Sequence, residues 1–124
     1  MPFFYLHSFV KLPAHIRYLA ISSISRIDSE TEMAAIVFRT CLEVTLKTLY
    51  PEYKAKNQYK KESTLEETTE DLYNRGILTK QIKEYCDIIR HNGNDAAHTG
   101  ELQDYIATII IAFVYVMEFC NKKF

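Results

Sequence analysis

The chain has 124 residues, with 15 Lys or Arg against 16 Asp or Glu, so its formal net charge at pH 7 is -1. A chain of this length is typical of a single domain and buries roughly two-thirds of its unfolded surface, which is enough for a core without disulfides. The balanced charge excludes a global basic field, so any contact with RNA or DNA has to be local.

The three cysteines, Cys41, Cys86 and Cys120, lie far apart, each within an apolar helical pattern. Their spacing fits neither a zinc site nor a disulfide scaffold, so we expect reduced core residues of a cytoplasmic protein. The start, "MPFFYLHSFVKLPAH", is apolar but has no basic segment and no small-residue cleavage site, which argues against a signal peptide.

The pattern of apolar residues predicts an all-α fold. Three glycines and three prolines leave few tight turns, and apolar residues recur with the helical period. We expect a single-domain helical bundle of about five helices, with residues 1–12 as an N-terminal extension and residues 13–124 as the helical domain.

The first helix is expected to open at Pro13, which suits a first helical turn, and to end near Asp28. "SETE" at 29–32 reads as a capping box, and it starts a long second helix that Pro51 stops. These two helices form a hairpin with almost no loop. Their apolar stripes are Ile16, Leu19, Ala20, Ser23, Ile24 and Ile27, and then Ala34, Val37, Phe38, Cys41, Leu42, Thr45 and Leu49.

The lysine-rich stretch "EYKAKNQYKKES", about residues 52–63, has no apolar stripe and is predicted to be the one long polar loop. A short third helix follows from about Thr64, with Leu65, Leu72 and Tyr73 facing inward. Gly76 is expected to close this helix in the left-handed conformation.

Thr79 is a candidate N-cap for a fourth helix, which bears Ile82, Tyr85, Cys86 and Ile89 and is expected to stop at Asn92-Gly93. The last helix is expected over about residues 101–121. Its 15-residue apolar run from Tyr105 to Phe119 is too short to span a membrane. This run has apolar residues on most sides of the helix, which is typical of a helix that other helices or a second subunit cover. We therefore predict a homodimer through apolar helices that include 101–121, with no membrane partner.

The stretch "IRHNGNDAAH", residues 89–98, allows two interpretations. In the first it is a helix joint: Gly93 ends the helix with a positive φ, Asn94 or Asp95 caps the segment after it, and His98 bonds back to the loop. In the second it is a site, in which Arg90 and His98 act together on an RNA phosphate. The histidine would accept or donate a proton while the guanidinium binds the phosphate oxygens, and this route needs no metal.

Other catalytic classes lack their motifs, since the sequence contains no GxxxxGK, GxGxxG, nucleophile elbow or HExxH. His7, His15 and His91 have no metal-ligand spacing, and we expect neither a metal nor a cofactor. The acidic run on the third helix is expected to be a solvated face rather than a metal site. It consists of Glu66, Glu67, Glu70 and Asp71.

Two segments carry a resemblance to a known family. "LPAHIRYLAISSISRIDSETEMAAIVFRTCLEVTLKTLY" resembles the opening helical hairpin, with an RxxLE-like core, of an uncharacterised bacterial domain family. "GILTKQIKEYCDIIRHNGNDAAH" is similar to that family's second signature, "IRxxGNxAAH". That family occurs alone and joined to type I restriction endonuclease subunits and other defence proteins, and it looks like a branch of the all-α HEPN superfamily.

The resemblance implies a function and a set of site residues. HEPN members that cut RNA work as dimers and carry an arginine, a polar residue and a histidine. Here the resemblance implies Arg90 as the phosphate-binding arginine, His91 or Asn92 as its polar neighbour, and His98 as the acid or base. We expect Asn94 to belong to the same site. A metal-independent endoribonuclease of bacterial defence or phage conflict is one expectation. The alternative is a non-catalytic module that binds a restriction, toxin-antitoxin or other defence protein.

Overall fold

The structure is a computed structural model that describes residues 9–56, 58–95 and 106–124, and only the backbone of residues 94 and 95. Within these ranges the fold is all-α, as predicted, and contains no strand. The elements are α2 (Ala14–Ser25), α3 (Thr31–Leu49), the 3-10 turn η1 (Pro51–Lys54), α4 (Leu65–Asn74), α5 (Lys80–Asp95) and α6 (Ile106–Asn121).

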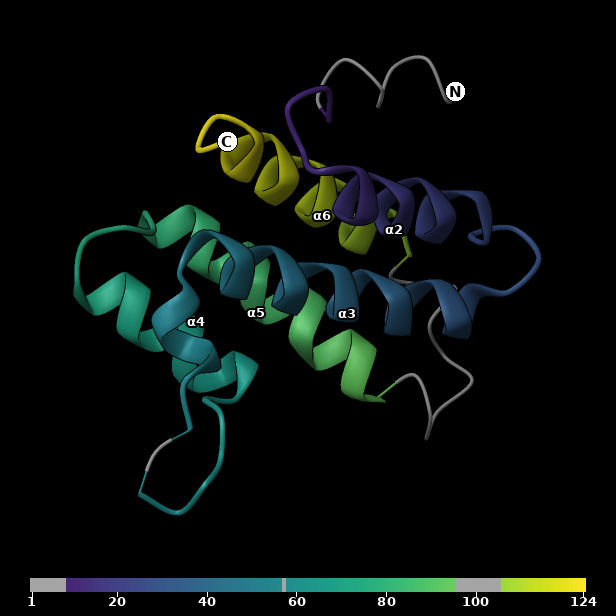
Figure 1. Cartoon of the computed structure of the whole chain (residues 1–124). Helices are drawn as coiled ribbons and strands as arrows, with labels where there is room; N and C mark the ends of the chain where they lie inside the picture. The colour runs from purple at the N-terminus through teal and green to yellow at the C-terminus, as the bar shows by residue number, and fades with distance from the viewer. Residues whose placement is uncertain (1–8, 57, 96–105) are drawn as a thin grey trace.

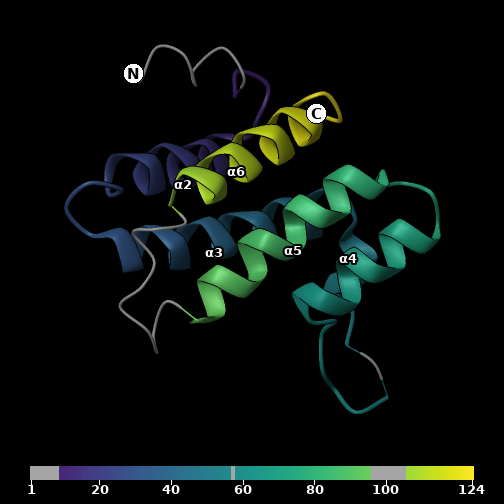
Figure 2. The ribbon, with the colours of Figure 1, turned by 180° about the vertical axis from the view of Figure 1, so that it is seen from behind.

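The helices form two layers. The antiparallel pair α2 and α3 makes the front layer in Figure 1, and α5 and α6 lie behind it. α3 packs against α2, α5 and α6, while α4 packs on α5 at the edge of the bundle (Figure 2). Because α3 contacts α2 in its own layer and both α5 and α6 in the other, its buried face holds the centre of the core.

Aromatic rings join the start of the described chain to both layers. The ring of Phe113 on α6 lies 4.3 Å from that of Phe38 on α3 and 6.4 Å from that of Phe9, centroid to centroid. Phe9 and Leu12 are buried, and the backbone N–H of Lys11 donates to Asn121 Oδ1 at 2.8 Å. The core therefore includes Phe9 and Leu12, which precede the domain start expected at residue 13.

Helix ends in the second half of the chain follow the sequence signals. Thr64 and Glu67 form a reciprocal capping box at the start of α4, with bonds of 3.1 and 2.9 Å. The hydroxyl of Thr79 accepts from Ile82 N at 3.1 Å and caps α5, as predicted. Gly76 closes α4 with φ 76°, also as predicted.

The capping box expected at residues 29–32 is wrong. α3 begins at Thr31, and its N-cap, Glu30, makes no capping bond through its side chain. α2 ends at Ser25, and turns continue beyond it: Glu30 N donates to Arg26 O at 2.8 Å, and the two side chains pair at 3.0 Å. These turns shape the segment between α2 and α3, and they place Glu30, rather than Ser29, at the N-cap position of α3.

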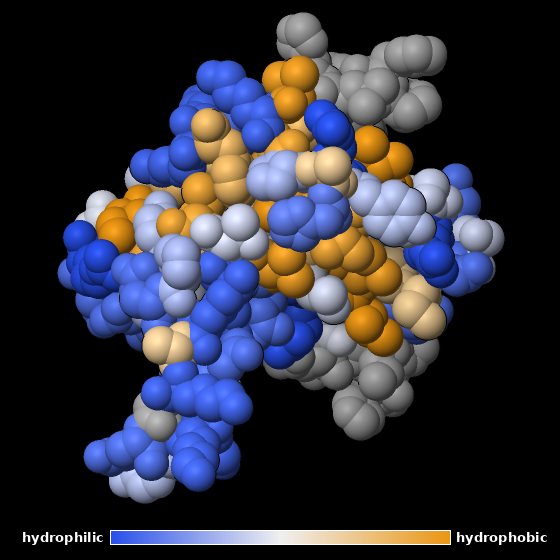
Figure 3. All heavy atoms as spheres, viewed as in Figure 1, coloured by the Kyte–Doolittle hydropathy of each residue, from blue (hydrophilic) through white to orange (hydrophobic). Residues whose placement is uncertain are grey.

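The polar loop expected over residues 52–63 begins with an ordered turn. Tyr53 in η1 is buried, and its hydroxyl donates to Asp71 at 2.5 Å and accepts from Arg75 at 2.8 Å. Burial and the Asp71 carboxylate raise the pKa of Tyr53. Beyond η1, the described residues of the segment include a hydrophilic lobe that extends from the bundle (Figure 3).

One inward position of the third helix was assigned wrongly. Leu65 and Leu72 are buried as predicted, but Tyr73 is exposed. Thr68 and Thr69 are buried instead, and their hydroxyls donate to carbonyls one turn earlier, at 2.8 and 3.1 Å. Threonine can enter the core here because the helix's own carbonyls satisfy its hydroxyl group.

The three cysteines are buried and unpaired, as expected for core residues. Burial raises the pKa of Cys41 and Cys120 to about 12 and that of Cys86 well above its ordinary value. All three are therefore protonated at neutral pH. Among the described residues, no helix is both long and apolar enough to cross a membrane.

Candidate functional site

Arg90 lies on α5, where that helix passes the beginning of α4. Its side chain is 13 % exposed. Arg90 Nη1 lies 3.8 Å from Glu66 on α4, and Nη2 lies 3.9 Å from Asp87 on the preceding turn of α5. Nη2 also lies 3.1 Å from His91 Nε2, within hydrogen-bond distance.

These contacts leave much of the guanidinium's bonding capacity unused. Separations of 3.8 and 3.9 Å provide charge attraction but are too long for hydrogen bonds. Arg90 Nε is buried and has no hydrogen-bond partner in the described parts of the chain. A guanidinium offers five N–H donors in a planar fork. The nearby carboxylates therefore hold Arg90 in place by charge, while its unused donors can still bind an anion.

The expected helix end at Asn92-Gly93 is wrong, because α5 continues to Asp95. Gly93 is helical, and Gly76 is the one glycine with positive φ among those described. A Cβ built on Gly93 would lie 2.6 Å from Arg39 Cβ and 3.1 Å from Ala35 O. This glycine therefore permits a close approach of α3 and α5 rather than a turn.

The other two predicted site residues are only partly placed. Asn94 belongs to α5, one helical turn after Arg90, so the two positions share a face of the helix. Its side chain and the segment that follows α5 lie outside the described residues. His98 lies outside the described residues, and its convergence with Arg90 stays a prediction.

The polar neighbours of Arg90 point in different directions. Asn92 Nδ2 donates to Ile88 O at 2.7 Å, so this side chain folds back on its own helix. His91 is exposed and lies against the Arg90 guanidinium. His15 is exposed on α2, and His7 lies outside the described residues. No group of three potential metal ligands occurs in the ranges that the structure covers.

The acidic residues of α4 are exposed, as expected, but they also bind neighbouring groups. Glu66 faces Arg90, and Glu70 pairs with Lys83 at 2.9 Å. Lys83 also bonds Asp87 at 2.8 Å, and these two carboxylates raise its pKa above the ordinary value. The acidic face thus fixes α4 on α5 beside the candidate site.

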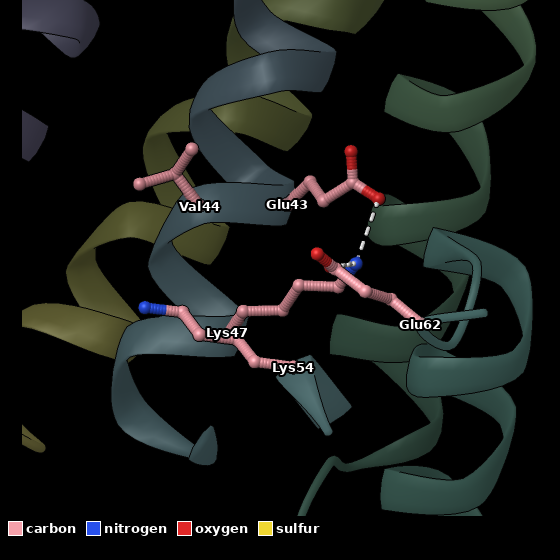
Figure 4. Close-up of a pocket in the computed structure, with 5 residues that line it drawn as sticks. All are labelled: Glu43, Val44, Lys47, Lys54 and Glu62. Atoms are coloured by element: carbon pink, nitrogen blue, oxygen red, sulfur yellow. Dashed lines mark hydrogen bonds and ion pairs between the residues drawn. The ribbon is translucent and has the colours of Figure 1, made fainter. Parts of the chain in front are cut away.

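A second polar cluster lies on α3. Lys47 is buried and bonds Glu43 at 3.4 Å and Glu62 at 2.9 Å (Figure 4). Burial alone would lower the pKa of Lys47, but the two carboxylates outweigh it and raise the value. With Val44 and Lys54 these residues line a hollow of about 260 Å³. The lysine's bonds are used within the cluster, which therefore anchors the polar segment to α3.

Sequence reasoning missed Arg39. It lies on α3 against Gly93, its Nη1 is 3.8 Å from Glu43, and its buried Nε has no hydrogen-bond partner within the described chain. A signal was present, because Arg39 opens the RxxLE-like run "RTCLE" and stands one turn after the buried Ala35. Arg39 thus packs from α3 onto the turn of α5 that begins at Arg90.

Comparison with known proteins gives one match. Residues 22–122 match the family model described as domain of unknown function (DUF4145), from the end of α2 through α6. No curated protein and no solved structure matches the chain. The family model covers well over half of the chain, including both arginines and Gly93, and the chain therefore belongs to the DUF4145 domain family.

Proposed function

We propose that this protein is a HEPN-like endoribonuclease that binds an RNA phosphodiester at the C-terminal part of α5 and cleaves it without a metal ion. The observation that carries this proposal is the set of contacts that the Arg90 side chain makes and leaves unmade. Its guanidinium is held by carboxylates at 3.8 and 3.9 Å, and its buried Nε has no hydrogen-bond partner among the described residues. A phosphate accepts hydrogen bonds from such a fork.

The reaction uses the RNA's own 2′-hydroxyl. His98, as base, takes the proton from this hydroxyl, whose oxygen attacks the adjacent phosphorus, and the bond to the 5′-oxygen breaks. An acid gives a proton to the leaving oxygen, so the products carry a 2′,3′-cyclic phosphate and a 5′-hydroxyl. Arg90 stabilises the charge that grows on the non-bridging oxygens, and Asn94, one turn later on α5, orients the phosphate in this proposal.

The resemblance places this activity in bacterial defence or phage conflict, in the cytoplasm. A homodimer through apolar helices that include α6 fits the function, since two copies would bring two such sites together. The exposure of Ile111 and Tyr115, each 52 %, supports α6 as part of that surface.

The test is cleavage of labelled RNA in EDTA by the wild type, His98→Ala and the surface control His15→Ala. We expect the wild type and the control to leave cyclic-phosphate ends, while His98→Ala leaves the RNA intact at an unchanged melting temperature. Equal cleavage by His98→Ala, or no cleavage by any of the three, would overturn the proposal.

A specific observation favours the alternative of a non-catalytic module that binds a partner protein. The surface of α2 and α3 exposes Tyr18, Ile21 and Met33, at 72, 37 and 45 %. If this surface binds a restriction or toxin subunit, Met33→Glu would weaken that complex at least tenfold and leave the isolated chain folded. Unchanged affinity for such a subunit would count against the alternative.

A further inference from the structure

Two buried N–H groups without a hydrogen-bond partner lie on the two helices that meet at Gly93. In the described chain they are the only buried side-chain nitrogen or oxygen atoms in this state: Arg39 Nε on α3 and Arg90 Nε on α5. Folded proteins pair nearly all buried donors, because an unpaired one keeps its full desolvation cost. Two such donors, on two helices packed against each other, favour an acceptor supplied by a ligand.

Gly93 fixes Arg39 at this crossing. Because Gly93 has no side chain, the stem of Arg39 lies directly on α5: a Cβ at Gly93 would be 2.6 Å from Arg39 Cβ and 3.1 Å from Arg39 Cδ. Arg90 stands three residues before Gly93, one turn back along the same helix. The glycine therefore brings a guanidinium from α3 to the turn of α5 that carries Arg90.

The charges around the two arginines leave a place for an anion. Arg39 lies 3.8 Å from Glu43, and Arg90 lies 3.8 Å from Glu66 and 3.9 Å from Asp87. None of these distances is a hydrogen bond, so the carboxylates attract the two guanidinium groups by charge but do not accept hydrogen bonds from their N–H groups. Planar guanidinium groups match the oxygens of a phosphate in geometry and charge.

We infer that Arg39 and Arg90 form a two-arginine site for an RNA phosphodiester at the crossing of α3 and α5. Arg39 donates to the phosphate from α3 and Arg90 from α5. The site therefore includes an arginine, Arg39, that lies outside the "IRxxGNxAAH" signature. The choice of RNA as the source of the phosphate rests on the proposed function. The pairing of the two arginines rests on the contacts of Gly93 and the two buried Nε atoms.

The test measures binding of a fluorescein-labelled 2′-O-methyl RNA, which cannot be cleaved, by anisotropy over a series of salt concentrations. Arg39→Lys is the central variant, because lysine keeps the charge and the aliphatic stem on Gly93 but lacks the Nε–H fork. Arg39→Gln removes the charge. Arg26→Gln is the matched control, since Arg26 is a surface arginine whose side chain bonds Ser22 and Glu30.

We expect Arg39→Gln to weaken binding by about tenfold and to lower the slope of log K against log salt by about 0.7, the value for one lost contact with a single strand. Arg39→Lys should lose most of the affinity but keep the salt slope, and Arg26→Gln should match the wild type. A structural role of Arg39 would change the melting temperature and leave the salt slope unaltered.

Three outcomes would overturn the inference: unchanged affinity in both Arg39 variants, no binding of the oligonucleotide by the wild type, or binding of inorganic phosphate alone. Failure of the proposed function is a separate result. Binding that depends on Arg39, with no cleavage of ordinary RNA, would refute the ribonuclease proposal but support the two-arginine site. Cleavage that is unchanged in the Arg39 variants would support the ribonuclease proposal but refute the role of Arg39 in the site.

Discussion

Gly93 on α5 and Arg39 on α3 are packed so closely that a Cβ on the glycine would lie 2.6 Å from the Cβ of the arginine. Real Cβ atoms do not approach this near, so any side chain at residue 93 must push the two helices apart. Both residues fall within the segment that matches the DUF4145 family. The contact therefore joins the fold's central helix pair to its candidate site.

Gly93→Ala is the direct test of this contact. Helix propensity alone would favour alanine by about 1 kcal/mol, but overpacking at a helix crossing costs about 1–3 kcal/mol. We expect a net loss of stability in urea unfolding. The double variant Arg39→Gly/Gly93→Ala removes the clashing Cβ and should recover part of that loss beyond additivity. A Gly93→Ala protein more stable than the wild type would contradict the close approach.

Glu66→Gln should strengthen binding of the 2′-O-methyl RNA. Glu66 is an exposed carboxylate 3.8 Å from Arg90 Nη1, and it competes with a phosphate for the same positive charge. An exposed pair of this kind is worth about 0.2–1 kcal/mol, so its removal should tighten binding by up to about fivefold. Glu84→Gln, an exposed substitution on the same helix as Arg90, is the control for net charge. Equal gains in both variants would point to a general charge effect.

Thr64→Ala and Ser29→Ala compare a capping box that forms with one that does not. Thr64 accepts from Glu67 N at 3.1 Å, and its loss should lower the free energy of unfolding by about 1 kcal/mol. Ser29 precedes the actual N-cap of α3, and its substitution should change stability by less than about 0.5 kcal/mol. Chemical denaturation of the two variants measures both values, and a larger cost at Ser29 would refute the observed start of α3.

Stability should decline in acid partly through Glu62. The bond from Lys47 lowers the pKa of Glu62 below its ordinary 4.5, so the unfolded chain binds the proton more readily than the folded one. The contribution is present above pH 4.5 and disappears as the pH falls through the lowered value. Urea unfolding between about pH 3 and pH 7 should show a shallower acid decline in Glu62→Gln. An identical decline would mean that Lys47 does not hold Glu62 in solution.

Apolar periodicity predicted the helices correctly because each stripe faces the core, as Phe38, Cys41 and Leu42 do on α3. Local sequence was enough to predict the helix ends at Thr79 and Gly76, because the capping groups lie within three residues of the groups they cap. It was not enough at Gly93, since a glycine that ends a helix and one that admits a neighbouring helix look alike without the neighbour.

The candidate site shows the same limit. Arg90 was identified from its motif, but Arg39 acquires its meaning only through Gly93, which lies far along the chain. The burial of Tyr53 likewise depends on Asp71 and Arg75 from another element. Polar residues whose partners are distant in sequence carry no periodic signal, so the structure was needed to pair them. The role of His98 stays a prediction.

The buried thiols make the chain a convenient carrier for chemical probes. Since Cys41, Cys86 and Cys120 are all protonated and shielded, maleimide reagents should pass over them in the folded protein. One cysteine introduced at an exposed position such as Glu84 would then be the single labelled site. In the proposed homodimer, a spin label there would report the distance between the two copies, with no native residue removed from the core.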